Sequence, residues 1–403
     1  MSEWRQIAQI ADTNPETLGV KTESDYRFRY IDLGAVEEGI VHWDSLQEFR
    51  FAGAPSRARR RVQPGDVLFG TVRPNLRSHG YVPEQPVGEL VASTGFSVIR
   101  PRDGISDGKY LFFSILGHEV YAQSVNAAVG SNYPAVNDRD VRQFRIFAPP
   151  LEEQKKIAQI LDSLDTQIRR TEALIAKLER IKQGLLTDLL TRGIDQNGQL
   201  RPAPDQAPHL YKDSPLGRIP KSWHTRSLGE TLRLQRGFDI TVASQTAGDY
   251  PVVSSSGITS YHNQYMVKGP GVVTGRKGKL GLTHYIESNF WPHDTSLWVK
   301  DFHGNNKKFA VILLDSLRLG RFDAATSVPT LNRNFVHPLL VSVPPVDEQN
   351  RIVEMKARLD ARTAKERRKC ERLRTLRTGL MDDLLTGRVR VTPLLGEAQQ
   401  RKV

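Results

Sequence analysis

The stretch PPLEEQKKIAQILDSLD, from Pro149 to Asp165, recurs as PPVDEQNRIVEMKARLD from Pro344 to Asp360. The same offset aligns KQGLLTDLLT, which starts at Lys182, with RTGLMDDLLT, which starts at Arg377, without any gap. Ahead of the two helical stretches, YPAVN falls on VPTLN at that offset as well. Several segments in one common register indicate that the chain contains two copies of one unit.

Each repeated segment predicts a long helix, over residues 149–192 and 344–388. Apolar residues recur there at steps of mostly three and four, the spacing of a coiled-coil seam. Prolines and acidic residues precede each run, and Gly193 and Gly387 follow, as is typical of helix starts and stops. The predicted seam residues are Ile157, Leu161, Leu164, Ile168, Ile175, Leu178 and Leu185 in the first helix, and Ile352, Leu359, Leu373 and Leu380 in the second.

The two helices are expected to pack on each other. About 40 residues give a helix of roughly 60 Å, and its apolar stripe needs a partner. The seam does not encode the direction of pairing. We expect an antiparallel pair, because it gives two similar units a pseudo-two-fold relation. The alternative is that each helix packs separately on its own domain.

The regions ahead of the helices, 1–148 and 223–343, have a different pattern. Short β-branched and aromatic runs such as GDVLFGTV and GPGVVTG alternate with turn signals, which predicts two mixed α/β, β-rich domains. Residues 193–222 are rich in proline and predict a surface linker. Residues 389–403 are expected to form a disordered C-terminal tail. The predicted fold class is α+β, with two such domains separated by a two-helix antiparallel coiled coil in an internal pseudo-two-fold repeat.

The charge balance points to a polyanionic partner. Lys and Arg number 57 against 45 Asp and Glu, a formal net charge of +12, in a chain of otherwise ordinary globular composition. A folded basic protein often binds nucleic acid, although a basic protein without such a partner is the plain alternative. A single cysteine excludes a disulfide framework. No apolar run reaches bilayer length and no export signal is present, so we expect a cytoplasmic protein.

A search for catalytic motifs finds none. The stretch PGVVTGRKGKLG lacks the first glycine and the hydroxyl residue of a phosphate-binding loop. His284, His293 and His303 do not have metal-ligand spacing. The Pro-Pro pairs are followed by Leu151 and Val346, so the Asn/Asp-Pro-Pro-aromatic tetrapeptide of an adenine methyltransferase is absent. We therefore predict no catalytic residue and no metal site.

Basic residues interleaved with small polar ones are the remaining candidates. Guanidinium groups suit phosphates and the paired acceptors of a guanine edge, and glycines let backbone amides approach a phosphate. Each of the two β-rich domains, called heads from here on, has one basic run that we interpret as a loop. The two runs together predict nucleic-acid binding. The candidates are Arg57, Arg59, Arg60, Arg61, Arg73, Asn75, Arg77 and Ser78 in the first head, and Ser255, Ser256, Tyr261, Arg276, Lys277 and Lys279 in the second.

The chain resembles the specificity subunit of a type I restriction-modification system. The resemblance rests on PPLEEQ and PPVDEQ, on GLLTDLLTRGI and GLMDDLLTGRV, and on PSRARRRVQPGDVLFGTVRPNLR and VTGRKGKLG. It implies two target-recognition domains that each read one half of a bipartite DNA sequence, spaced by the paired helices. A helix of roughly 60 Å is compatible with half-sites about one duplex turn apart.

The resemblance also implies partners and further contacts. It implies a chain without catalysis or cofactor of its own, which docks two methyltransferase subunits using S-adenosylmethionine, and restriction subunits using ATP and Mg²⁺. A coiled-coil scaffold without DNA affinity and an enzyme with an unrecognised nuclease site are the alternatives. Glu153, Gln154, Glu348 and Gln349 orient the helix starts or dock the methyltransferase, the first role being favoured. The DNA contacts added by the resemblance are Asn132, Tyr133, Thr326, Ser327 and Arg333.

Overall fold

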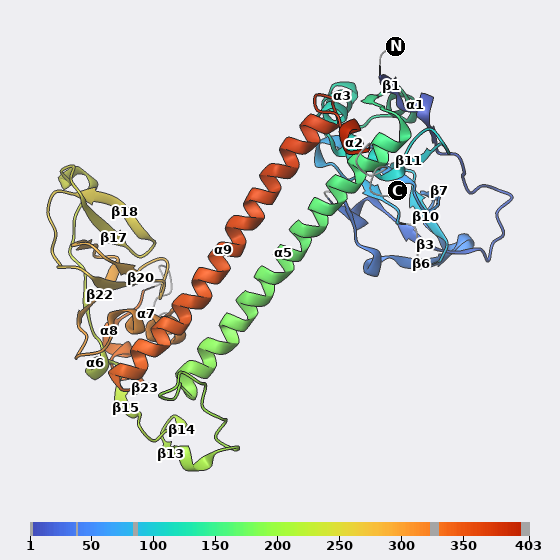
Figure 1. The fold of residues 1–403 in the computed structure, drawn as a ribbon. Helices are drawn as coiled ribbons and strands as arrows, with labels where there is room; N and C mark the ends of the chain where they lie inside the picture. The colour runs from blue at the N-terminus through green and yellow to red at the C-terminus, as the bar shows by residue number, and fades with distance from the viewer. Residues whose placement is uncertain (1–2, 38, 84–87, 323–329, 396–403) are drawn as a thin grey trace. The chain divides into compact units, whose positions relative to one another are not determined.

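The computed structural model describes residues 3–37, 39–83, 88–322 and 330–395. The chain divides into two compact units, Met1–Glu172 with Arg368–Val403, and Ala173–Arg367. The boundary falls inside both long helices, α5 (Leu151–Thr191) and α9 (Val346–Leu384). Each unit therefore contains one globular head and one half of each long helix (Figure 1).

The head of the first unit is built on two four-stranded sheets. One has the order β2-β11-β8-β9, with β2 (Ala11–Thr13), β11 (Phe96–Pro101), β8 (Val67–Gly70) and β9 (Gly80–Tyr81). The other has the order β6-β3-β10-β7, with β6 (Gln47–Arg50), β3 (Arg27–Ile31), β10 (Leu90–Ser93) and β7 (Ala58–Val62). Smaller pairs join β1 (Trp4–Gln6) to β12 (Arg145–Phe147) and β4 (Val36–Glu37) to β5 (Ile40–Val41). The helices are α1 (Ile7–Ile10), α2 (Gly108–Leu116), α3 (His118–Ala127) and α4 (Asp138–Gln143).

The head of the second unit repeats the first of these sheets. Its order is β16-β22-β19-β20, with β16 (Arg233–Arg236), β22 (Ser296–Asp301), β19 (Gly271–Gly275) and β20 (Thr283–Ile286). A three-stranded sheet has the order β18-β17-β21, with β18 (Gly257–His262), β17 (Tyr250–Ser254) and β21 (Trp291–Pro292). Two strand pairs join β15 (His224–Ser227) to β23 (Leu340–Val343) and β13 (Tyr211–Ser214) to β14 (Gly217–Pro220). The helices are α6 (Leu228–Thr231), α7 (Lys307–Ser316) and α8 (Arg333–Val336).

The two matching sheets show that the internal repeat extends into the heads. Every strand pair in both sheets is antiparallel. Ranked by their position in the chain, the four strands of each sheet lie in the order first, fourth, second, third. Asn137 and Asn332, which share the repeat register, cap α4 and α8 by accepting backbone N–H bonds. The strands are short and carry different side chains, so this shared topology is not visible in the sequence.

The long helices pair antiparallel in each unit, as predicted. In the first unit Arg377 pairs with Asp165, and Arg374 donates to Glu172 at 2.6 Å. In the second, Arg367 donates to Glu179 at 3.0 Å, and Lys182 to Asp360 at 2.6 Å. Partners earlier in α5 thus meet residues later in α9.

Burial of the predicted seam is uneven. Ile157 and Leu161 lie in the hydrophobic core of the first head, and Ile352 lies in that of the second, so these three also anchor the heads. Buried seam residues are Ile157, Leu161, Leu164, Ile168, Leu178 and Ile352. Half-buried ones are Ile175, Leu185, Leu359, Leu373 and Leu380.

Gln154 and Gln349 join each helix start to its own head. The Gln154 side chain accepts the N–H of Asp107, the N-cap of α2, and donates to the carbonyl of Pro149. The Gln349 side chain makes the same two bonds, to Asn306 at the N-cap of α7 and to Pro344. Both amides are buried, so they orient the helix starts.

The predicted linker and tail differ from the structure. Within residues 193–222 the pair β13–β14 forms, and Ile194, Tyr211 and Ile219 are buried. In the predicted tail, Val391 is only 3% exposed and belongs to the core of the first head. Single apolar residues without periodicity anchor both segments, which is why the sequence pattern does not reveal them. Among the described helices, none is both long and apolar enough to cross a bilayer.

Candidate nucleic-acid interface

One basic run in each head directly follows the corresponding strand of the shared sheet. This strand is β8 in the first head and β19 in the second. In the first head, Thr71 after β8 donates its N–H to Gly95, and its carbonyl accepts from Val136. In the second, Arg276 after β19 makes the same two bonds, with Thr295 and Leu331. The geometry therefore places the two runs at one topological position. Their residues differ at that position.

In the first head, two arginines flank a single 3-10 turn, Pro74–Leu76. Arg73 and Arg77 both have φ of 50°, in the left-handed region that favours glycine. The second head has Gly278 and Gly281 in that region, at φ of 76° and 71°, after its own central strand. Non-glycine residues in this region carry strain, which tends to be kept at functional sites.

Aromatic rings hold both of these arginines. The Arg73 guanidinium lies 4.3 Å from the ring centroid of Tyr133 and donates to the carbonyl of Asn132 at 3.3 Å. The Arg77 guanidinium lies 4.3 Å from the ring centroid of Tyr121. Tyr133 is 68% exposed. The structure thus brings together the predicted contacts Arg73, Asn132 and Tyr133. Asn75 is exposed on the turn between Arg73 and Arg77, and Ser78 is half-buried.

The other arginine run of the first head is not a loop. Arg59, Arg60 and Arg61 lie on strand β7, and only Arg57 lies in the preceding turn. Arg60 donates to Asp138 at 3.0 Å, and Arg61 pairs with Glu16 and Glu89, both at 3.2 Å. Acids from distant parts of the chain therefore compensate Arg60 and Arg61. Arg59 lies over the Phe51 ring at 5.1 Å from its centroid.

In the second head some of the predicted contacts lie at the turn that contains Gly278. Lys279 is exposed at this turn, whereas Lys277 is half-buried and pairs with Thr330 through an isolated β-bridge. Ser255 is buried beside the turn, and a Cβ at Gly278 would lie 3.9 Å from its Oγ. Ser256, Tyr261 and Arg333 are exposed. The predicted contacts Thr326 and Ser327 lie outside the described residues.

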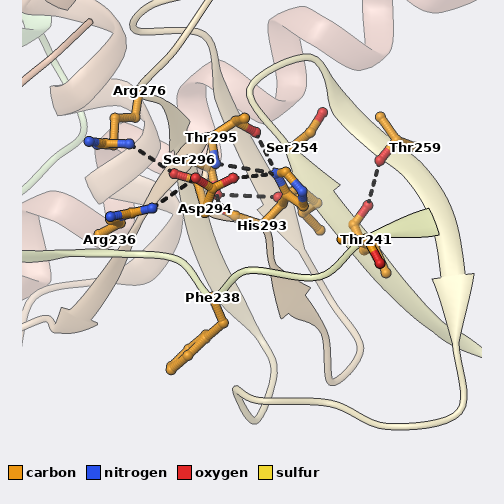
Figure 2. Close-up of polar contacts among 12 residues, drawn as sticks. Arg236, Phe238, Thr241, Ser254, Thr259, Arg276, His293, Asp294, Thr295 and Ser296 are labelled. Carbon is orange, nitrogen blue, oxygen red and sulfur yellow. Dashed lines mark hydrogen bonds and ion pairs between the residues drawn. The ribbon is translucent and has the colours of Figure 1, made fainter. Parts of the chain in front are cut away.

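The sequence pattern missed a polar cluster of the second head that joins residues from distant segments (Figure 2). Arg236, the last residue of β16, donates through Nη2 to Oδ2 of Asp294 at 2.9 Å. Arg276 donates to the backbone carbonyl of Asp294 at 3.2 Å. Burial and the nearby Arg236 lower the pKa of Arg276. Arg236 is a single arginine in the stretch LQRGFD, which matches no motif. Only the folded sheet brings it beside Asp294.

One group in the described part of the chain has metal-ligand chemistry. Ligand atoms of Asp239, His293 and Asp294 lie within 4.8 Å of one another, although their sequence spacing does not predict a site. The Asp294 carboxylate already pairs with Arg236, and a second guanidinium, that of Arg276, bonds to its carbonyl. Arg236 therefore already neutralises the negative charge that Asp294 would offer to a metal ion.

These features define a duplicated α+β protein with paired long helices and a basic surface on each head. Residues 60–180 and 220–374 match the family described as Type I restriction modification DNA specificity domain. The chain belongs to this family: it is a specificity subunit of a type I restriction-modification system, and it recognises DNA.

Relatives and solved structures similar to the chain are known. The chain is 24% identical over 333 residues to the type I restriction enzyme MjaVIII specificity subunit of Methanocaldococcus jannaschii, covering 75% of each chain. It is similar in fold to the HsdS subunit from Thermoanaerobacter tengcongensis, with a TM-score of 0.55, 22% identity, and coverage of 96% and 97%. A structure from work on assembly and conformational transition of the type I R-M system has a TM-score of 0.62, 21% identity, and coverage of 96% and 98%.

Proposed function

We propose that each head reads one half of a bipartite DNA target. The observation that carries this proposal is the shared sheet, which presents a different basic surface after the same strand in each head. The first head offers Arg73 stacked on Tyr133, and the second offers Arg276 with Lys279. Two similar scaffolds with unlike contact residues suit an asymmetric, divided sequence, because base contacts specify and phosphate contacts position.

The paired helices have a proposed role of their own. They belong to both units, and we assign to them the spacing of the half-sites and the docking of two methyltransferase subunits. Restriction subunits complete the proposed assembly. Within it this chain is non-catalytic and binds no cofactor, whereas S-adenosylmethionine, ATP and Mg²⁺ act on the partner subunits. Glu153, Gln154, Glu348 and Gln349 are buried, which favours a structural role over direct docking for them.

The experiment is a selection from random-sequence duplex DNA. The chain is co-expressed with the methyltransferase subunit proposed as its partner, and the purified complex selects duplexes that are then sequenced. We expect two short half-sites separated by a spacer of constant length. Arg73→Ala is expected to change one half-site, and Arg276→Ala with Lys277→Ala the other. A single continuous site, or changes confined to the same half-site, would contradict the proposal.

Two controls separate the alternatives. A scaffold without DNA affinity enriches no sequence in the same selection. A chain with an unrecognised nuclease site cleaves duplex DNA alone in the presence of Mg²⁺, and this activity is lost with a chelator. We expect enrichment by the complex and no cleavage by the isolated chain.

A further inference from the structure

The pair formed by Arg236 and Asp294 is built to present a guanidinium to solvent. The two residues are 58 positions apart and come from the end of β16 and the turn after β21. The Asp294 side chain is 15% exposed, whereas that of Arg236 is 54% exposed. The acid is therefore largely enclosed by the head, whereas the guanidinium bonded to it is about half exposed to solvent. Figure 2 shows the two side chains pointing toward each other.

The carboxylate of Asp294 is little exposed and lies against two neighbouring side chains. Its Oδ2 accepts from Arg236, and its Oδ1 lies 3.2 Å from Nδ1 of His293. The same ring nitrogen lies 2.9 Å from Oγ1 of Thr295. Because the carboxylate is largely enclosed, the guanidinium bonded to it loses little further freedom on binding a ligand.

Arg236 keeps free donors for such a ligand. Among the contacts of the described residues, its guanidinium is bonded through Nη2 to Asp294. A guanidinium carries five N–H donors in a planar fork, so the fork retains a side that can bind two acceptors. Such a fork fits the O6 and N7 acceptors of guanine in the major groove.

The neighbouring charge favours a base edge over a phosphate. Asp294 offsets the charge of Arg236 and repels an incoming anion, whereas a neutral acceptor pair suffers no such repulsion. Arg276 and Lys279 have no carboxylate bonded to them among the described contacts, so a phosphate is open to them as well as a base edge. We propose that Arg236 reads a guanine in the half-site of the second head, with Asp294 as its positioning residue. This inference rests on the proposed function and adds the base that is read.

The test uses the random-duplex selection with variants of the full chain in its complex. In Arg236→Ala we expect one position of one half-site to lose its guanine preference by roughly 5- to 150-fold, the range for one bidentate contact. Arg236→Lys keeps the charge but lacks the fork, so it should lose the same preference and bind duplexes more tightly than the alanine variant does. Arg233→Ala removes an exposed arginine of the same strand and should leave the preference intact.

Asp294→Asn tests the positioning role. Removing this negative charge should weaken the guanine preference while raising affinity for non-target duplex and steepening its salt dependence. A purely structural residue would lower stability without raising non-target binding. A chelator should leave all of these results unchanged, and loss of sequence preference on chelation would instead assign the cluster to a cation.

The outcomes separate this inference from the proposed function. If the unaltered complex selects no bipartite site, the proposed function fails. A second outcome is that the unaltered complex selects a bipartite site while both Arg236 variants keep the base preference at every position or bind all sequences more weakly alike. In that case only the assignment of Arg236 is overturned. The other half-site is an internal control for folding. If the alanine variant alters both half-sites, the result of the lysine variant decides whether Arg236 reads the guanine. The lysine variant retains most of the side-chain packing, so it is expected to fold.

Discussion

Arg390 donates two hydrogen bonds to Glu153 across 237 residues of sequence, at 2.9 Å through Nε and 2.6 Å through Nη2. The N–H of Val391 donates to the same carboxylate at 3.1 Å. In the second unit, Glu348 accepts from the Arg201 guanidinium and from the N–H of Ile194. Each helix start is therefore bonded to the segment that follows the other helix, and the repeat includes part of the predicted tail.

Glu153→Gln should destabilise the first unit. The variant keeps the shape of the side chain but removes the charge that Arg390 and Val391 bond, and hydrogen bonds to a charged group contribute about 1.5–3 kcal/mol. Urea unfolding should show a loss of that order. Glu152→Gln, at an exposed neighbouring position whose side chain is 71% exposed, is the matched control. Equal stability of the two variants would contradict the structural role of Glu153.

His79 should make the first unit sensitive to mild acid. The ring is buried, its Nδ1 accepts the N–H of Gly70 at 3.1 Å, and burial lowers its pKa to about 3. The unfolded chain takes up a proton near pH 6.5, which the folded chain resists, so stability is fully present above that pH. As the pH falls from about 6.5 towards 3, the unfolding free energy should drop by up to about 1.4 kcal/mol per pH unit.

The pH profile of His79→Gln gives the comparison. Glutamine can accept the Gly70 N–H but does not titrate, so the part of the acid sensitivity due to His79 should disappear. The measurement is urea unfolding at several pH values between 7 and 4, with the difference in slope as the readout. Identical slopes for the two proteins would show that His79 does not titrate on unfolding.

Arg73→Gly should be more stable than Arg73→Ala, by about 1 kcal/mol. Both variants lose the guanidinium and its stacking on Tyr133, but alanine keeps a Cβ in the left-handed backbone at φ of 50°. Both should lose the same preference in the DNA selection. Thermal unfolding of the pair measures the strain, and equal stability would show that the left-handed conformation is not costly here.

Leu178→Asp should disturb the helix pair and with it the spacing of the half-sites. Leu178 is 4% exposed on α5, and an unpaired buried carboxylate is strongly unfavourable. We expect reduced stability of the second unit and selected duplexes without a constant spacer. Lys177→Asp places the same charge at an exposed neighbouring position and should keep the spacer. An unchanged spacer in Leu178→Asp would contradict the proposed role of the helices.

The long helices could be predicted from the sequence because their signal is local. Buried seam positions, among them Leu161 and Leu178, belong to a series that recurs at steps of mostly three and four residues. The proline pairs mark where each helix begins. The direction of pairing became visible only through contacts such as Glu172 with Arg374, which join distant residues. Gly193 and Gly387 follow the helix ends, both with positive φ.

The interface could be predicted only in part. Arg73 and Tyr133 were both identified as candidates, but the stacking between them depends on a fold that local patterns do not encode. In the sequence Arg60 and Arg61 resemble unpaired loop residues. The acids that pair with them lie far away along the chain, so the pairing cannot be seen in the local pattern. Asp294 has no motif around it, and its importance depends on which arginines the sheet places beside it.

The Glu153 bonds have a consequence for synthesis of the protein. The second unit is one continuous stretch, Ala173–Arg367, so all of its residues are translated before Arg390 and Val391. The first unit must wait for Arg390 and Val391, although most of it was made first. The head translated last is therefore expected to mature ahead of the head translated first, reversing the usual order for a two-domain chain.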